Sequence, residues 1–451
     1  MRKLIATSAC VTASVLAFAQ TNPAITSWLQ NTTVKGRHYV SGNSTAITDA
    51  SLTANVQSVQ YSANFVYATT QGIPSYVVGP YLDGNPSQAT NQNAIFKFPL
   101  TPVQNTATAV STTGGNIGVF INGAAMFDYR DGVSWKNSTG AYAGGPIGGM
   151  GDGVWNRDAI PAEKAGFDCS KGHPAMGNYH HHQNPSAFDL DLNVISTICN
   201  LYDADGLYAL DSTVHSPLIG FAYDGFPVYG AYAYKNTNGT GGIVRMKSSF
   251  SLRNITVRNT LYTGASVTAG PNVSTTYPLG TFKEDYQFIT PTASDYLDYH
   301  NGRFCVTPEY PAGTYCYFAT VDANWNSAYP YLIGPTYYGT KVAAKVTSIS
   351  ESVTSYTASS TGVNSNSIND GKVNVFPNPA SDLIAIQIKD LVKENYDVVL
   401  YDVTGKVVEQ KTLYQGSTIV YFDTKTLYSG VYFVKIIVGD NVINKKIIIE
   451  K

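Results

Sequence analysis

Four of the seven histidines of this chain lie within ten residues, at His173, His180, His181 and His182. An imidazole can ligate a metal ion, transfer a proton or serve as a hydrogen-bonding group in a core, so the cluster is the strongest candidate for chemistry. If residues 179–183 are extended, the period of two places His180 and His182 on one face. Tyr179 and His181 then lie on the other face, and we expect them to line the site.

A third imidazole lies within reach of this pair. The turn from Pro174 to Gly177 can fold His173 back toward His180 and His182. Three neutral imidazoles with an open coordination position suit Zn or Cu. Two alternatives stay open: a structural cluster in which each ring is hydrogen-bonded, and acid–base chemistry without a metal.

Five further residues are candidates at the border of this site. His215 is a possible fourth ligand, or else a structural histidine. Asp224 opens an Asp-Gly-Phe-Pro turn and fits a turn residue better than a catalyst. His300 precedes Asn-Gly, which is also typical of a plain loop. Asp168 and Glu163 are close enough in sequence to His173 to orient an imidazole N–H.

Short strands must position these groups. From residue 20 to about 341, apolar alternations such as 94–98 are separated by Gly, Pro, Asn and Asp turns, which predicts a large, loop-rich antiparallel β domain. Residues 342–372 are rich in Ser and Thr and predict a linker. Residues 373–451 return to strands and predict a small β-sandwich, with strands at 383–388, 397–401, 419–422, 430–438 and 441–449. The fold class is therefore mainly β.

The N-terminus indicates export. Arg2 and Lys3 precede an apolar stretch, and Ala17-Phe18-Ala19 fits a cleavage site, so residues 1–19 are predicted to be a signal peptide. No later stretch reaches the roughly 18 apolar residues of a membrane-spanning helix. The mature chain is therefore expected to be secreted, without a transmembrane helix.

Charge and motifs exclude several functions. With 29 basic and 31 acidic residues there is no charge excess for a polyanion, so we expect no nucleic-acid partner. The sequence also lacks a Gly-x-Ser-x-Gly elbow, a His-Glu-x-x-His motif and a Walker loop. Whether the chain is an enzyme, and on which substrate, does not follow from these residues.

Four cysteines remain after the signal peptide, which allows two disulfides in an exported protein. Cys305 and Cys316 flank a Pro/Gly turn as the arms of a hairpin would, and are the favoured pair. Cys169 with Cys199 then follows by elimination. The alternative is that Cys169 is a metal thiolate beside His173.

The C-terminal segment contains the stretches 375–382 (VFPNPASD), 400–406 (LYDVTGK) and 429–435 (SGVYFVK) and has a basic end. Over about eighty residues, these features closely resemble the type A C-terminal sorting domain of the type IX secretion system of Bacteroidetes. The resemblance implies passage across the outer membrane through that machinery, removal of the module, and release or attachment at the cell surface. A carbohydrate-binding or adhesion sandwich is the alternative.

The histidine segment carries a second resemblance. Residues 177–182 (GNYHHH) are similar to the signature of the YHYH domain family, in which an aromatic residue usually stands where this chain has His181. Further similar stretches are 153–159, 172–174, 215–230, 298–303 and 329–335. The resemblance implies a YHYH domain but no reaction. The sequence thus predicts a secreted or cell-surface protein that binds a transition metal, or alternatively an adhesion protein with a metal-free histidine cluster.

Overall fold

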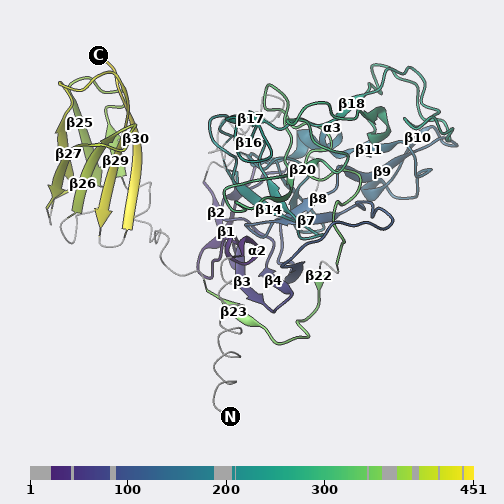
Figure 1. Ribbon diagram of the computed structural model, residues 1–451, viewed down its shortest axis with the longest axis horizontal. Coiled ribbons are helices and arrows are strands. Elements are labelled where there is room, and N and C mark those ends of the chain that lie inside the picture. Colours follow the sequence, from purple (N-terminus) through teal and green to yellow (C-terminus); the bar gives the residue numbers. More distant parts are fainter. Residues whose placement is uncertain are drawn as a thin grey trace, which may run out of the picture. The chain divides into compact units, whose positions relative to one another are not determined.

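The computed structural model describes residues 22–41, 45–81, 88–186, 206–208, 210–342, 345–357, 373–388, 396–414, 417–438 and 441–451. The chain divides into two compact units, Met1–Thr357 and Ala358–Lys451 (Figure 1). The predicted signal peptide, residues 1–19, lies outside the described residues. Within the described ranges, no helix has the length and apolar character needed to cross a membrane.

The largest sheet of the first unit contains eight strands and carries the histidine cluster at one edge. Its strand order is β12 (His173–Ala175), β13 (Asn178–His181), β8 (Ala125–Phe127), β7 (Asn116–Phe120), β14 (Leu218–Ala222), β15 (Pro227–Tyr229), β21 (Thr314–Phe318) and β20 (Gly302–Cys305). Most neighbouring strands are antiparallel, but β13 runs parallel to β8, and β15 runs parallel to β21.

A second sheet of five antiparallel strands belongs to the same unit. Its order is β22 (Lys345–Val346), β6 (Ala94–Pro99), β4 (Phe65–Thr70), β3 (Val56–Tyr61) and β23 (Thr354–Tyr356). Burial alternates along β6, where Ala94, Phe96 and Phe98 point inward. This is the alternation that the sequence shows, and it gives the sheet one apolar face.

The two large sheets share one hydrophobic core. Trp28, which follows the short helix α2 (Pro23–Thr26), packs at 5.5 Å from Phe98 of β6 and at 5.3 Å from Phe221 of β14, measured between ring centroids. Phe98 and Phe221 are fully buried. Because this core lies directly beneath β14, β7 and β8, it fixes the strand against which the histidine hairpin pairs.

Smaller elements complete the first unit. Three short sheets contain the strands β2 (Ile47–Thr53), β1 (Lys35–His38) and β5 (Val77–Val78); β10 (Ala141–Gly144), β9 (Arg130–Lys136) and β11 (Asn156–Asp158); and β16 (Tyr232–Tyr234) with β17 (Ile243–Arg245). A further two-stranded sheet pairs β18 (Phe250–Leu252) with β19 (Tyr286–Phe288). The helical segments are α3 (Ala159–Glu163), η1 (Gly145–Ile147), η2 (Lys164–Gly166) and η5 (Lys283–Asp285).

The second unit consists of two antiparallel sheets around a core of its own. The first is β24 (Val373–Phe376), β25 (Leu383–Ile388) and β28 (Ile419–Asp423). The second is β27 (Val407–Leu413), β26 (Tyr396–Asp402), β29 (Gly430–Val438) and β30 (Asn441–Ile449). The prediction of a mainly β chain with a small β module at its C-terminal end is thereby confirmed.

The predicted linker, residues 342–372, contributes in part to the first unit. β22 pairs with β6 and β23 pairs with β3, so each adds an edge strand to the five-stranded sheet. The pairing partners supply the hydrogen bonds and apolar contacts that this Ser/Thr-rich stretch lacks by itself. Residues 358–372 lie outside the described part of the chain.

Candidate metal centre

The histidine cluster starts in a hairpin at the edge of the eight-stranded sheet. β12 pairs with β13 so that His173 lies directly opposite His180. The two strands are joined by Met176 and Gly177, whose φ angles of 48° and 81° lie in the left-handed region that tight two-residue turns require. The turn therefore folds His173 onto the strand that carries the other histidines, as the sequence predicts.

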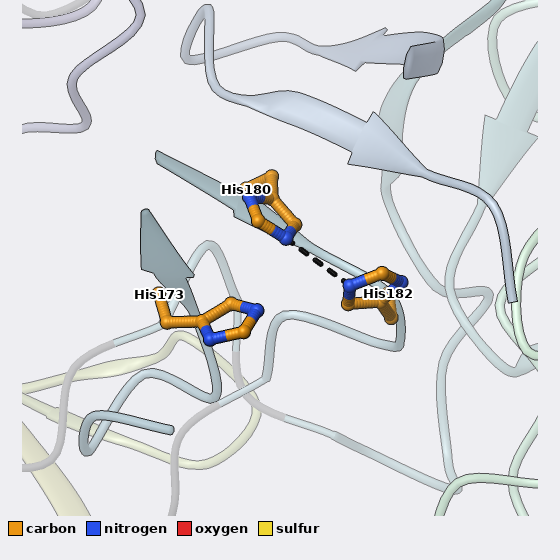
Figure 2. A group of neighbouring side chains, drawn as sticks. All are labelled: His173, His180 and His182. Atoms are coloured by element: carbon orange, nitrogen blue, oxygen red, sulfur yellow. Dashed lines mark hydrogen bonds between the residues drawn. The ribbon is translucent and has the colours of Figure 1, made fainter. Parts of the chain in front are cut away.

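The rings of His173, His180 and His182, which we call the histidine trio, come together in the interior (Figure 2). One nitrogen of each ring lies within 4.8 Å of those of the other two. Ring centroids are 4.6 Å apart for His173 and His180 and 4.8 Å apart for His180 and His182. No member of the trio is more than 4% exposed. The trio thus has the common focus that a shared metal ion needs.

Hydrogen bonds determine which nitrogens face this focus. The Nδ1 atoms of His180 and His182 donate to the carbonyl oxygens of Asn178, at 2.9 Å, and of Asp128. Because a carbonyl oxygen only accepts, each Nδ1 carries the hydrogen, and the neutral ring presents a lone pair at Nε2. The two Nε2 atoms are 3.1 Å apart (Figure 2). Two lone pairs at this distance repel unless a cation, either a proton or a metal ion, lies between them.

Helix α3 brings a carboxylate against the trio. Oε2 of Glu163 lies 3.2 Å from Nε2 of His182 and 3.4 Å from Nε2 of His173. Asp158, directly before the helix, caps it because its carboxylate accepts the backbone N–H of Ile160. Burial acts to raise the pKa of Glu163, but the two imidazoles beside its Oε2 outweigh burial and hold the pKa well below its usual range. Glu163 therefore supplies a negative charge beside the rings.

Aromatic side chains wall off the trio. The Phe127 ring stacks on His180 with centroids 3.6 Å apart and planes inclined by 17°. Phe167 meets His173 edge-on at 4.9 Å. Burial lowers the pKa of His180 well below its ordinary value, and the neighbouring rings of His182 and His173 lower it further. The ring of His180 is therefore neutral, which is the form that ligates metals.

The side chains on the opposite face of β13, His181 and Tyr179, form hydrogen bonds that stabilise the fold around the trio. The Nδ1 atom of His181 donates to the carbonyl of Lys171, and its Nε2 lies 2.7 Å from the hydroxyl of Tyr76. Burial lowers the pKa of His181 to about 3. The Tyr179 hydroxyl donates to Asp168, which also accepts three backbone N–H groups. These bonds fix the loop that leads into β12, so the residues support the trio without belonging to it.

Three other candidate residues do not join the trio, which is the one three-ligand group found in the described part of the chain. His215 is not part of the three-ligand group: its Nδ1 donates to the carbonyl of the next residue, and its ring contacts Tyr229. His300 is bound to the carbonyl of Thr336. Asp224 is fully buried and accepts the hydroxyl of Tyr317, so it fixes a turn. None of the three side chains contributes an atom to the group formed by His173, His180 and His182.

The predicted disulfide between Cys305 and Cys316 is absent, because both residues are buried free thiols. They lie on the paired strands β20 and β21, but Cys305 is opposite Thr314, and Cys316 is opposite Arg303. The two cysteines are therefore diagonal neighbours, two residues out of register. The hydrogen bond with the Cys316 thiol lowers the pKa of Cys305 to about 7.

Of the other predicted pair of cysteines, only one lies within the described residues. Cys169 is buried, and its sulfur belongs to a disulfide, which argues against a metal thiolate at this position. Cys199, the partner expected by elimination, lies outside the described residues. This pairing therefore stays a prediction.

Three contributions to the centre were not predicted. They are the stacking ring of Phe127, the edge contact of Phe167 and the Asp128 carbonyl that sets the tautomer of His182. Phe127 and Asp128 belong to the neighbouring strand β8 and its end, some fifty residues before the histidines. No local pattern relates them to the cluster, because only the parallel pairing of β8 with β13 brings them there.

Comparison with known families accounts for both units. Residues 95–330 match the family described as YHYH protein, and residues 374–450 match the secretion system C-terminal sorting domain. No curated protein matches the chain. The first match includes the whole trio together with Glu163, and the second coincides with the second unit. The chain therefore belongs to the YHYH protein family and carries a C-terminal sorting domain, which makes it a secreted or cell-surface protein.

Proposed function

We propose that this protein binds one transition-metal ion, Zn or Cu, through the Nε2 atoms of His180 and His182 together with the ring of His173. The observation that carries the proposal is the 3.1 Å separation of two Nε2 atoms whose Nδ1 partners both donate to carbonyls. Such an arrangement calls for a cation, and burial disfavours a proton on His180. A metal ion satisfies both lone pairs at once.

The donor set supports the choice of metal. Imidazole nitrogen is a good ligand for Zn and Cu and a poor one for Ca and Mg, which take oxygen ligands. Three imidazoles leave a coordination position for Glu163 or for an exogenous group. The negative charge of Glu163 also offsets part of the charge of a buried divalent ion.

One observation favours the metal-free alternative, in which the cluster is structural and the protein acts through surface interactions. Glu163 lies close enough to His182 and His173 to share a proton with either ring. A buried imidazolium–carboxylate pair of this kind needs no metal. The two proposals therefore differ in whether a metal ion or a proton lies among the imidazole rings, and a measurement of the metal content of the protein distinguishes them.

Elemental analysis of the purified mature chain after loading with Zn or Cu and removal of excess tests the proposal. We expect about one equivalent in the wild type and less than about a tenth in His180→Gln plus His182→Gln. The matched control, His38→Gln plus His300→Gln, changes two histidines outside the trio and is expected to keep the metal. Circular dichroism establishes that each variant is folded. Less than about a tenth of an equivalent in the loaded wild type would refute metal binding.

The second unit supports a route of export. We infer that it addresses the chain to the type IX secretion machinery of a Bacteroidetes bacterium, which carries it across the outer membrane. The support is the match of residues 374–450 to a sorting domain and the separate, self-contained core of this unit. The machinery is thus the one partner that we propose, and the outer surface or the medium is the destination.

A further inference from the structure

A cavity of about 390 Å³ lies next to the proposed metal centre. It shares two segments with the trio. Ile160 and Pro161 of α3, and Lys164 just after it, line the cavity, while Glu163 of the same helix contacts His173 and His182. Gln183 also lines the cavity and directly follows His182 in the chain. The volume is within the range of small-molecule sites.

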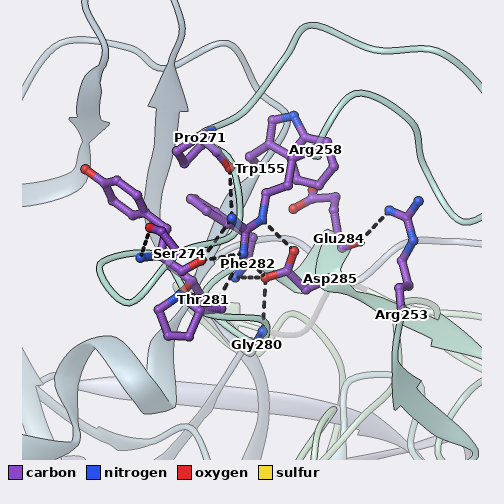
Figure 3. A network of polar contacts seen from close by, with 12 residues as sticks. Trp155, Arg253, Arg258, Pro271, Ser274, Gly280, Thr281, Phe282, Glu284 and Asp285 are labelled. Carbon is purple, nitrogen blue, oxygen red and sulfur yellow. Dashed lines mark hydrogen bonds and ion pairs between the residues drawn. The ribbon is translucent and has the colours of Figure 1, made fainter. Parts of the chain in front are cut away.

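One wall of the cavity is held by a buried ion pair (Figure 3). Arg258 and Asp285 are fully buried and joined by two hydrogen bonds of 2.7 and 2.9 Å. Arg258 also donates to the carbonyls of Tyr277 and Pro278, and Asp285 accepts the N–H of Gly280. Since residues 278–281 form the wall, this network shapes the cavity in advance of any ligand.

The lining is apolar on one part and donor-rich on another. Apolar surface comes from Ile160, Pro161, Leu279 and Tyr286, whose ring stacks on a neighbouring tyrosine. Lys164 is the one charged side chain among the described residues of the lining, so the net charge there is positive. A ligand that fills this cavity should therefore have an apolar body and an anionic group.

A second observation points to an acceptor on the ligand. Gln183 is 2% exposed, and its Oε1 accepts the hydroxyl of Ser327, another lining residue. Its Nε2 has no hydrogen-bond partner among the described residues. A buried amide N–H without a partner has lost its hydrogen bonds to water without replacement, and an acceptor on a ligand would restore one.

We propose that this cavity binds a small organic carboxylate with an apolar body, whose carboxylate is recognised by Lys164 and by the amide of Gln183. An ammonium and an amide N–H are both donors, and a carboxylate accepts from two donors at once. The proposal goes beyond metal binding and does not rest on it, because none of the three histidines lines the cavity. Because α3 borders both the cavity and the trio, a carboxylate bound in the cavity would lie close to a metal ion bound by the trio.

Titration of the full mature chain with benzoate, followed by ligand-observed NMR, tests the proposal. Benzyl alcohol, which has the same ring without the charge, is the matched probe. We expect benzoate to bind with a Kd in the millimolar range or below and about tenfold more tightly than benzyl alcohol. Lys164→Gln should weaken benzoate about tenfold and leave benzyl alcohol unchanged. Lys136→Gln, at the end of β9 and outside the lining, should change neither.

The outcomes separate this proposal from metal binding. Benzoate affinity should be the same before and after chelator treatment, and the same in His180→Gln plus His182→Gln. Equal affinities for benzoate and benzyl alcohol, no effect of Lys164→Gln, or no benzoate binding up to about 10 mM would each overturn the carboxylate assignment. None of these results would bear on whether the trio holds a metal.

Discussion

His173 lies directly opposite His180 across the β12–β13 hairpin, so the spacing of these two imidazoles is set by a two-residue turn. Gly177 of that turn has a φ of 81°, and its carbonyl accepts the N–H of Thr90. A Cβ at this position would lie 2.1 Å from Oγ1 of Thr90. The geometry of the trio is thus coupled to a residue that is not itself a ligand.

Gly177→Ala should therefore weaken metal binding as well as stability. The left-handed backbone alone costs about 1–2 kcal/mol for a residue with a Cβ, and the clash with Thr90 adds to this. Gly140→Ala is the matched control, because Gly140 has a φ of 63° and open space around its Cβ position. We expect both variants to unfold at lower denaturant, and only Gly177→Ala to lose zinc affinity. Equal zinc affinity in both would contradict the coupling.

Glu163→Gln should lower metal affinity and leave the stoichiometry at saturation intact. The amide keeps the shape of the side chain but removes the negative charge 3.2 Å from the Nε2 atom of His182. A loss of about 10- to 100-fold is typical when a group that supports metal ligands is removed. Competition with a chromophoric zinc chelator measures the change. Glu409→Gln, an exposed change in β27, controls for net charge, and an equal loss there would argue against a role for Glu163.

The sequence predicts strands well where hydrophobic alternation is strong and poorly where pairing decides. β25, β29 and β30 have the predicted bounds, whereas β27, an edge strand of mixed polarity, was not predicted. The β22 and β23 strands within the predicted linker were missed for the same reason, since their stability comes from β6 and β3.

For the candidate site, too, local sequence patterns are predictive and long-range strand pairing is not. The period of two and the turn before it bring His173, His180 and His182 together, and both features can be read locally. The disulfide prediction failed because the turn between Cys305 and Cys316 does not reveal the register of β20 and β21. His215 and His300 were considered as candidates from their sequence neighbourhoods, but neither belongs to the three-ligand group of the described residues.

Asp224 should make stability depend on pH. Burial raises its pKa to about 6, against roughly 3.9 in an unfolded chain. The folded protein therefore holds a proton more tightly, and this contribution, on the order of 2–3 kcal/mol, is present at low pH and lost as the pH rises through about 6. The difference in unfolding free energy between the wild type and Asp224→Asn should fall between about pH 4 and pH 6 and then level off.

Denaturant unfolding at half-unit pH steps measures this difference. Asp211→Asn serves as the control, because Asp211 is exposed and its pKa is lowered by hydrogen bonding with Thr213. A pH-independent difference for Asp224→Asn would show that its carboxyl titrates alike in the folded and unfolded chains.

The exported protein should lack its second unit. If residues 374–450 act as a sorting signal that is removed after passage, peptides beyond about Val373 will be missing from protein recovered at the cell surface or in the medium. Peptides of the first unit serve as the internal reference in mass spectrometry of the same sample. Intact C-terminal peptides outside the cell would count against removal, and retention of the full chain inside would count against the sorting function.

The burial of the trio has a consequence for the rate of metal exchange. Since no ring of the trio is more than 4% exposed, an ion held there cannot leave by a simple step into solvent. Release must wait for a local opening of the hairpin or of α3, so its speed reports the free energy of that opening rather than the strength of the ligand bonds alone. A metal ion bound by the trio would therefore stay with the protein when the protein is diluted.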